Sequence, residues 1–142
     1  MATVTSLFGD CPTAGSRYRQ LALVVHATCA LVFFDLLAIR GFERTHRFTR
    51  ARRVARRNPQ SEVVPRVCRA VEEACAWYFK RTLCLQRSSV TAWLLRRQGV
   101  PAEVVIGFRP VPIDSHAWVE VQGQVVNDKP QYQKHFKVLE RL

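Results

Sequence analysis

The sequence lacks the local motifs that mark common nucleotide, metal and disulfide sites. It contains no GxGxxG or Walker loop and no internal repeat, and its five cysteines form no CxxC pair. The four histidines, at positions 26, 46, 116 and 135, show no zinc-ligand spacing. These absences exclude a dinucleotide or P-loop nucleotide fold, a zinc motif and a disulfide scaffold. We therefore expect a protein that works without a cofactor or a metal ion.

The N-terminus also lacks a secretion signal. Residues 1–15 are polar and contain no charged stretch followed by an apolar one. Together with the odd number of cysteines, this favours the reducing cytoplasm as the location. The 142 residues, of which 48% are hydrophobic, suffice for one compact domain with a buried core.

Lysine is scarce, and arginine supplies most of the positive charge. The chain has 18 arginines and 4 lysines against 11 acidic residues, and ten of these arginines fall within residues 40–69. The densest part is residues 44–57, where seven of fourteen residues are arginine. Such a block is either a solvated surface or a docking site for an acidic partner. No recognised nucleic-acid motif accompanies it, so nucleic acid is the less favoured partner.

One long apolar segment covers residues 21–39 and is interrupted by His26, Thr28 and Asp35. A membrane-spanning helix needs about 20 apolar residues, so the length alone does not distinguish a membrane helix from a buried core helix. An acidic residue at the centre of such a helix costs about 2–3 kcal/mol in lipid, and less near an end. We therefore favour a buried core helix over a membrane-associated one.

The rest of the chain predicts two helices followed by three strands. Apolar residues recur every three or four positions over 62–78, with Cys68 and Cys75 on the apolar stripe. A second helix is expected over 84–98, ended by Gly99 and Pro101. Strands are expected over residues 102–108, 116–121 and 124–128. Because the helices precede one continuous run of strands, the predicted fold class is α+β.

Three residues stand out by their placement in these elements. Cys84 begins a helix, His116 begins a strand and Asp128 ends the next strand. A helix N-terminus favours the thiolate form of a cysteine, which is its nucleophilic form. A neighbouring imidazole can take up and return the proton, and a carboxylate can orient that imidazole. The three residues therefore predict a Cys-His-Asp catalytic site.

The turn between the last two strands decides whether His116 meets Asp128. A three-residue loop over 121–123, with Gly123 in the left-handed conformation, would place the two residues directly opposite each other. A two-residue loop would instead place Asp128 opposite Ala117. Because the two-residue loop requires a positive φ at Gln122, we favour the three-residue loop.

Several motifs resemble the leader peptidase of lasso-peptide biosynthesis. They are Cys84-Leu-Gln-Arg-Ser88, Trp93-Leu-Leu-Arg-Arg-Gln-Gly-Val-Pro101, Val105-Ile-Gly107, His116-Ala-Trp-Val-Glu120 and Val126-Asn-Asp128. The resemblance covers about residues 60–130. It implies a transglutaminase-like fold related to papain-type proteases, with Cys84 as nucleophile, His116 as base and Asp128 as its orienting residue. It also implies removal of the leader from a ribosomally made lasso precursor.

The resemblance further implies a division of the chain and a set of partners. Residues 1–59 form a helical, arginine-rich lead-in, and residues 60–142 form the peptidase core. No run of short strands precedes the core, so we expect the stand-alone peptidase half of a split system. A separate small leader-binding protein would then recognise the precursor, and an asparagine-synthetase-like, ATP-using cyclase would act on the product.

Two other functions remain open at this point. The same superfamily includes acyl transferases and other amide hydrolases, so a triad alone does not define the substrate. The chain could also be a non-catalytic, arginine-rich binding module in which Cys84 is a core residue. A catalytic cysteine reacts quickly with iodoacetamide near neutral pH, whereas a core cysteine reacts slowly, so alkylation separates these readings.

Overall fold

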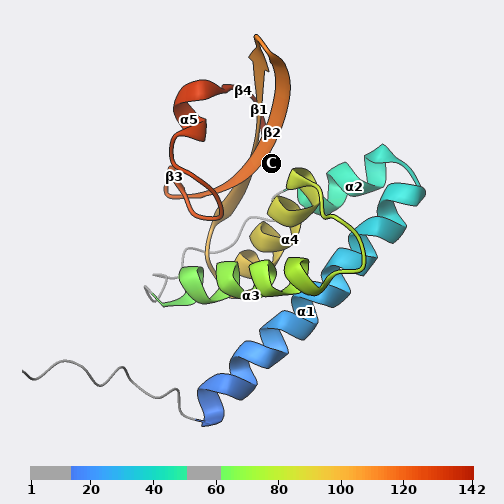
Figure 1. The fold of residues 1–142 in the computed structure, drawn as a ribbon, viewed down its shortest axis with the longest axis vertical. Coiled ribbons are helices and arrows are strands. Elements are labelled where there is room, and N and C mark those ends of the chain that lie inside the picture. The colour runs from blue at the N-terminus through green and yellow to red at the C-terminus, as the bar shows by residue number, and fades with distance from the viewer. Residues whose placement is uncertain (1–13, 51–61) are drawn as a thin grey trace, which may run out of the picture.

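The computed structural model describes residues 14–50 and 62–142 and consists of a helical layer beside a small antiparallel sheet (Figure 1). The helices are α1 (Ala14–Ile39), α2 (Phe42–Thr49), α3 (Val63–Trp77), α4 (Cys84–Arg97) and α5 (Tyr132–His135). The strands are β1 (Ala102–Pro110), β2 (Ile113–Val121), β3 (Gln124–Val125) and β4 (Lys137–Arg141), in the order β3-β2-β1-β4. The predicted α+β class is confirmed.

Helix α4 lies at the centre of the fold. It packs against α1 and α3 on one side and against β1 and β2 on the other. The main core forms where these elements meet, and its fully buried members include Leu31, Val67, Leu95, Val104 and Val119. Because α4 contacts every large element, the residue that begins this helix is held firmly relative to both the helices and the sheet.

The end of α4 follows the sequence prediction. Gly99 has φ +81°, and the N–H of Val100 donates to the carbonyl of Leu95 at 3.0 Å, so the helix stops at a left-handed glycine. The guanidinium of Arg96 then donates to three backbone carbonyls, those of Thr49, Ala102 and Leu142, each at 2.8 Å. A single side chain thus joins α2, β1 and the C-terminus to α4.

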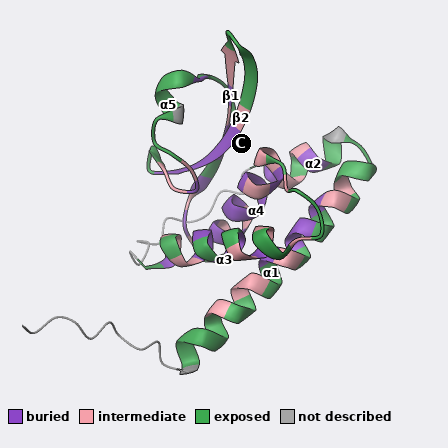
Figure 2. Ribbon diagram, viewed as in Figure 1, coloured by how far each residue is buried: buried purple, intermediate pink, exposed green. Residues whose placement is uncertain are grey.

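Helix α1 is buried on one stripe only. Ala27, Ala30, Leu31 and Phe34 are at most 6% exposed, whereas the opposite stripe is open to solvent (Figure 2). The exposed apolar residues of that stripe include Leu21, Val25, Val32, Leu36 and Ile39. The expectation of a buried core helix therefore holds for one stripe of α1 only, and 22% of its apolar window is buried. Among the described residues, α1 is the one helix long and apolar enough to cross a membrane.

Asp35 shows why an acidic residue occurs in an otherwise apolar segment. Its carboxylate accepts hydrogen bonds from Tyr78 at 2.7 Å and Gln86 at 3.0 Å, and it pairs with Lys80 at 2.7 Å. Burial raises the pKa of Asp35, but the bonds from Lys80, Tyr78 and Gln86 outweigh this effect and hold it below its ordinary value. The charged carboxylate therefore fastens α1 to α4 and to the segment that precedes it.

The strands differ from the sequence prediction at their ends. β2 begins three residues before His116, and β3 contains two residues where five were expected over 124–128. Strand β4 and the short helix α5 were not predicted. All five side chains of β4 are exposed, so this edge strand has no alternation of apolar and polar residues that the sequence could reveal.

The prediction of a three-residue loop between β2 and β3 is wrong. Val121 pairs with Gln124 and Glu120 with Val125, so the loop contains only Gln122 and Gly123. Both residues have positive φ, 53° and 77°, which is the backbone of the tight two-residue hairpin turn. Gln122 adopts the left-handed conformation, which is unfavourable for glutamine and for which the two-residue loop was not favoured. The structure thus has the register in which Asp128 is not directly opposite His116.

A second, smaller core lies on the other face of the sheet. It contains Val105, Trp118 and Phe136, all at most 6% exposed. Gly107 of β1 pairs with His116 of β2 and lies under this cluster. A Cβ atom at Gly107 would lie 2.7 Å from both the Trp118 ring and the Phe136 Cβ. Glycine is therefore required here by space, because the indole ring occupies the position of a side chain.

The arginine block of residues 44–57 is only partly described. Its first part lies in α2 and at the residue that follows this helix, where Arg44, Arg47 and Arg50 are exposed. The arginines at 52, 53, 56 and 57 lie outside the described residues. The proposed docking role of the block stays a prediction.

Replacing Asp35 with asparagine should destabilise the protein by about 1 kcal/mol at pH 7, because a charge-assisted contact is lost. Its folded-state pKa lies below the ordinary value of 3.8, so the ionised group stabilises the fold above that pH. This contribution disappears as the pH falls through the lower folded-state value. Urea unfolding of Asp35→Asn and wild type should therefore differ at pH 7, and the difference should shrink as the pH falls below 3.8. Asp114→Asn, at a half-exposed carboxylate, serves as the control. An equal difference at pH 7 and below pH 3.8 would contradict this interpretation.

Replacing Gly107 with alanine should lower the free energy of unfolding by about 1–3 kcal/mol, because the new methyl group overlaps the Trp118 ring and Phe136. Chemical denaturation measures the effect. Gly15→Ala is the matched control, since no atom lies within 4 Å of a Cβ there, and its stability should be unchanged or slightly higher. Equal stabilities for the two variants would show that the close approach at Gly107 is not limiting.

Candidate active site

Cys84 is the first residue of α4, as the sequence predicts. The preceding Leu83 is extended, so the chain enters the helix abruptly and the first N–H groups of α4 have no partner within the helix. The half-buried thiol lines a cleft of about 690 Å³. The cleft is lined by Glu72, Cys75, Ala76, Arg81, Thr82, Leu83, Cys84, Arg87 and His116. The structure therefore brings the predicted nucleophile and the predicted base to one cleft.

His116 and Asp128 are in direct contact. The Nε2 atom of His116 lies 2.9 Å from Oδ2 of Asp128, and both side chains are less than one-fifth exposed. Neither residue lies where it was predicted in its strand, because His116 is the fourth residue of β2 and Asp128 follows β3. The predicted contact is confirmed, and the catalytic roles of Cys84, His116 and Asp128 stay predictions.

The contact forms because β3 ends early. In a regular ladder, the Val119 N–H would donate to the Val126 carbonyl. Here it donates to the side-chain oxygen of Asn127 at 2.7 Å, and the Val126 carbonyl accepts from the Cys68 thiol at 3.4 Å. The Val126 N–H still donates to the Val119 carbonyl at 3.0 Å, so the backbone turns away from β2 directly after this bond. If β3 continued in the same register, Asp128 would lie opposite Ala117. Because the chain turns away instead, the Asp128 side chain contacts His116.

Ser88 and Asn127 hold this turn against α4. The Asn127 amide donates to Ser88 Oγ at 3.0 Å, and Ser88 Oγ donates to the Ala117 carbonyl at 2.9 Å. Both side chains are buried, so each polar atom needs the partner it has. The pair links the helix of Cys84 to the strand of His116 and to the turn of Asp128.

Arg87 makes a second connection between the same elements. It lies one turn after Cys84 on α4, and its guanidinium binds the same Oδ2 atom of Asp128 that His116 contacts. The Asp128 side chain is 13% exposed, so its charge is largely removed from water. Two cationic or donor groups, from α4 and from β2, therefore fix the orientation of one carboxylate.

The residues after His116 on the same face of β2 support its ring. Trp118 is fully buried and lies close to His116, with ring centroids 6.4 Å apart and planes 22° apart. The Trp118 indole donates to Glu120 at 2.8 Å, and Glu120 also binds Gln133 and Arg141. Burial raises the pKa of Glu120, but the bonds from Arg141, Gln133 and Trp118 outweigh it and lower the pKa. An ionised, buried carboxylate thus orients the ring beneath the predicted base.

Cys68 illustrates a cysteine in a structural environment. It is buried on α3, and burial, together with the nearby charge of Glu72, raises the pKa of its thiol to about 11. It is therefore neutral near pH 7. Cys75, which was also assigned to the core, packs against the core but lines the cleft as well. In residues 14–50 and 62–142, no group of three or more His, Cys, Asp and Glu side chains could hold a metal ion.

The residues that support the site were not predicted from the sequence, although they lie within the motifs around Cys84, His116 and Asp128. Arg87 and Ser88 belong to the segment around Cys84, Trp118 and Glu120 follow His116 at alternate positions, and Asn127 precedes Asp128. Alternation along a strand signals that Trp118 and Glu120 share a face with His116. No local signal shows that Ser88 meets Asn127, because the contact spans 39 positions in the chain.

Comparisons with known proteins identify a relative and a family of the chain. The microcin J25-processing protein McjB of Escherichia coli is 39% identical to the chain over 59 residues, which are 42% of this chain and 28% of that protein. The match thus spans less than a third of McjB. No solved structure shows significant similarity to the chain. A family model for the transglutaminase-like superfamily matches residues 27–141, which is most of the sequence. The chain therefore belongs to the transglutaminase-like superfamily.

Proposed function

We propose that this protein is a cysteine peptidase that removes the leader from a ribosomally made lasso-peptide precursor. The observation that carries the proposal is the cleft that Cys84 and His116 line together, with His116 bound to Asp128 at 2.9 Å. Membership of the transglutaminase-like superfamily supports an enzyme that acts on amide bonds. The identity with a microcin-processing protein supports a peptide precursor as the substrate.

The proposed mechanism assigns one step to each residue of the triad. Asp128 accepts the Nε2 proton of His116, so Nδ1 is the nitrogen that accepts the proton of the Cys84 thiol. The sulfur attacks the scissile carbonyl carbon and forms a C–S bond. When the C–N bond breaks, the imidazolium returns the proton to the leaving amine. Water then hydrolyses the thioester, which releases the leader carboxylate and regenerates the thiol.

The start of α4 supplies the stabilisation that the tetrahedral intermediate needs. Its backbone N–H groups have no carbonyl partner within the helix, and the helix dipole is positive at this end. The N–H of Cys84 is the first donor to the developing oxyanion. The Gln86 side chain is not a second donor, because it is buried and bound to Leu31 and Asp35.

Partners complete the proposed reaction. A separate small protein binds the leader and presents the precursor to the cleft, and an ATP-using, asparagine-synthetase-like cyclase consumes the freed core peptide. The reaction takes place in the cytoplasm, where cysteines stay reduced.

Iodoacetamide should alkylate Cys84 faster than any other described cysteine near neutral pH, because the imidazole of His116 lines the same cleft and can take up the thiol proton as the sulfur attacks. Cys29 is an internal control, since it is exposed but has no such environment, and Cys68 should react most slowly because its pKa is about 11. Mass spectrometry of tryptic peptides measures each rate. Replacing His116 with alanine should slow Cys84 and leave Cys29 unchanged. If Cys84 reacts no faster than Cys29 in the wild type, the proposed activation is wrong.

Asp128→Asn should lower the rate of leader cleavage by about 10- to 10⁴-fold with little change in fold, because asparagine retains a hydrogen-bond acceptor but not the charge that stabilises the imidazolium. Arg87→Ala should cause a smaller loss, and Arg87→Lys should recover part of it, because lysine keeps the charge without the planar fork. Single-turnover cleavage of the precursor, followed by mass spectrometry, measures these rates. A comparable loss in Asp114→Asn, whose carboxylate is distant in register and half exposed, would show that the effect is not specific.

A further inference from the structure

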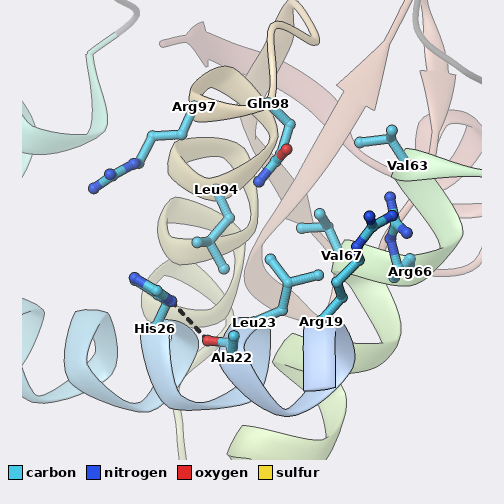
Figure 3. Close-up of a pocket in the computed structure, with 10 residues that line it drawn as sticks. All are labelled: Arg19, Ala22, Leu23, His26, Val63, Arg66, Val67, Leu94, Arg97 and Gln98. Carbon is cyan, nitrogen blue, oxygen red and sulfur yellow. Dashed lines mark hydrogen bonds between the residues drawn. The ribbon is translucent and has the colours of Figure 1, made fainter. Parts of the chain in front are cut away.

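A second cavity, of about 450 Å³, lies between α1, α3 and the end of α4 (Figure 3). Its floor is apolar and is formed by Leu23, Val63, Val67 and Leu94, of which the last three are buried. Its rim is basic and carries Arg19, Arg66 and Arg97. Among the residues that the structure describes, no acidic one lines this cavity, which we name the arginine groove.

Two of the three arginines of the groove lie close together. Figure 3 shows the side chains of Arg19, from α1, and Arg66, from α3, converging at one side of the cavity. Among the described residues, neither forms an ion pair within 4.0 Å, and the buried Nε of Arg66 has no hydrogen-bond partner. Bringing two like charges together costs free energy, and a bound carboxylate between them would recover it.

The amide of Gln98 and the apolar floor define the rest of the ligand. Figure 3 shows the Gln98 side chain directed into the cavity, where its amide can bind a backbone group. Arg97 extends to the far side, with its guanidinium 4.9 Å from the Trp93 ring centroid. A peptide that carries carboxylates beside an aliphatic side chain matches this combination of a basic rim and an apolar floor.

The size and position of the groove select a peptide rather than a folded partner. A cavity of this volume accommodates a few side chains, whereas a stable interface between folded proteins needs about 800 Å² on each partner. Cys84 begins α4 and Arg97 ends it, which is 13 residues, or about 20 Å along the helix axis. An extended peptide spans that distance with about six residues.

We propose that the arginine groove is a remote binding site for an acidic, aliphatic segment of the peptide substrate. The inference rests on the proposed peptidase function for the identity of its occupant. Binding at the groove raises the local concentration of the scissile bond near Cys84 without taking part in the chemistry.

The test uses fluorescence anisotropy with a short labelled peptide in which glutamate and leucine alternate. The protein carries Cys84→Ala, so binding is measured without cleavage. The double variant Arg19→Glu with Arg66→Gln should weaken binding by about 5- to 10-fold, which corresponds to the loss of two partly exposed ion pairs. The matched control is Arg44→Glu with Arg47→Gln on α2, which changes the net charge equally and lines no part of the groove. It should weaken binding by less than about twofold.

Two further peptides test the chemistry of the ligand. A glutamine–leucine peptide should bind weakly because it lacks the carboxylates, and a glutamate–serine peptide should bind weakly because it cannot cover the apolar floor. Equal binding of the glutamate–serine and glutamate–leucine peptides would overturn the proposal, and so would equal losses in the groove variant and the α2 control. Either result would show that the peptide binds through general electrostatic attraction to a basic protein and not through the groove.

The outcomes for the groove and for the proposed function are separable. If the acidic peptide binds the groove while Cys84 shows neither fast alkylation nor cleavage, the peptidase proposal fails and the binding site stands. If Cys84 cleaves the precursor while the groove variant binds the labelled peptide like the wild type, the groove proposal fails and the peptidase stands.

Discussion

The carboxylate of Asp128 is the contact on which the geometry of the candidate site depends. One of its oxygens meets both Arg87, from the helix that begins with Cys84, and His116, from β2. Because this carboxylate is largely buried, removing either neighbour leaves a charge that water cannot fully solvate. The helix, the strand and the turn are therefore held by one group. A carboxylate that joins three elements keeps Cys84 and His116 in fixed positions before a substrate arrives, which is the preorganisation that the proposed mechanism requires.

The sequence predicts elements well where their patterns are local. The apolar periodicity and the glycine after α4 locate both helices of the core within one residue of their ends, and the placement of Cys84 follows directly. The prediction of the β2–β3 turn fails because Gln122 has a positive φ, which glutamine rarely adopts. The contacts that hold the chain beyond β3, such as Asn127 with Ser88, join residues far apart in the sequence, and no pattern along the chain reveals them. His116 and Asp128 were thus paired correctly through an incorrect register.

Helix α1 shows how composition and environment can disagree. Its apolar residues surround the helix, but only one stripe meets α3 and α4, and Asp35 is tied to Tyr78 and Gln86 within the fold. Drawing this part of α1 into lipid would break those bonds and leave a carboxylate to be protonated or desolvated. The apolar composition of α1 can be read from the sequence. The contacts of Asp35 cannot be predicted from it, because its partners lie more than 40 positions away in the chain.

The early end of β3 has a consequence for the solubility of the sheet. Beyond β3, the outer edge of β2 would present unpaired backbone groups to any extended chain, which is how sheets join edge to edge and aggregate. Here the Val119 N–H is taken by Asn127 and the Ala117 carbonyl by Ser88. Side chains thus close the edge where a strand is missing. The same two residues that set the position of Asp128 also keep this stretch of β2 from serving as a template for a foreign strand.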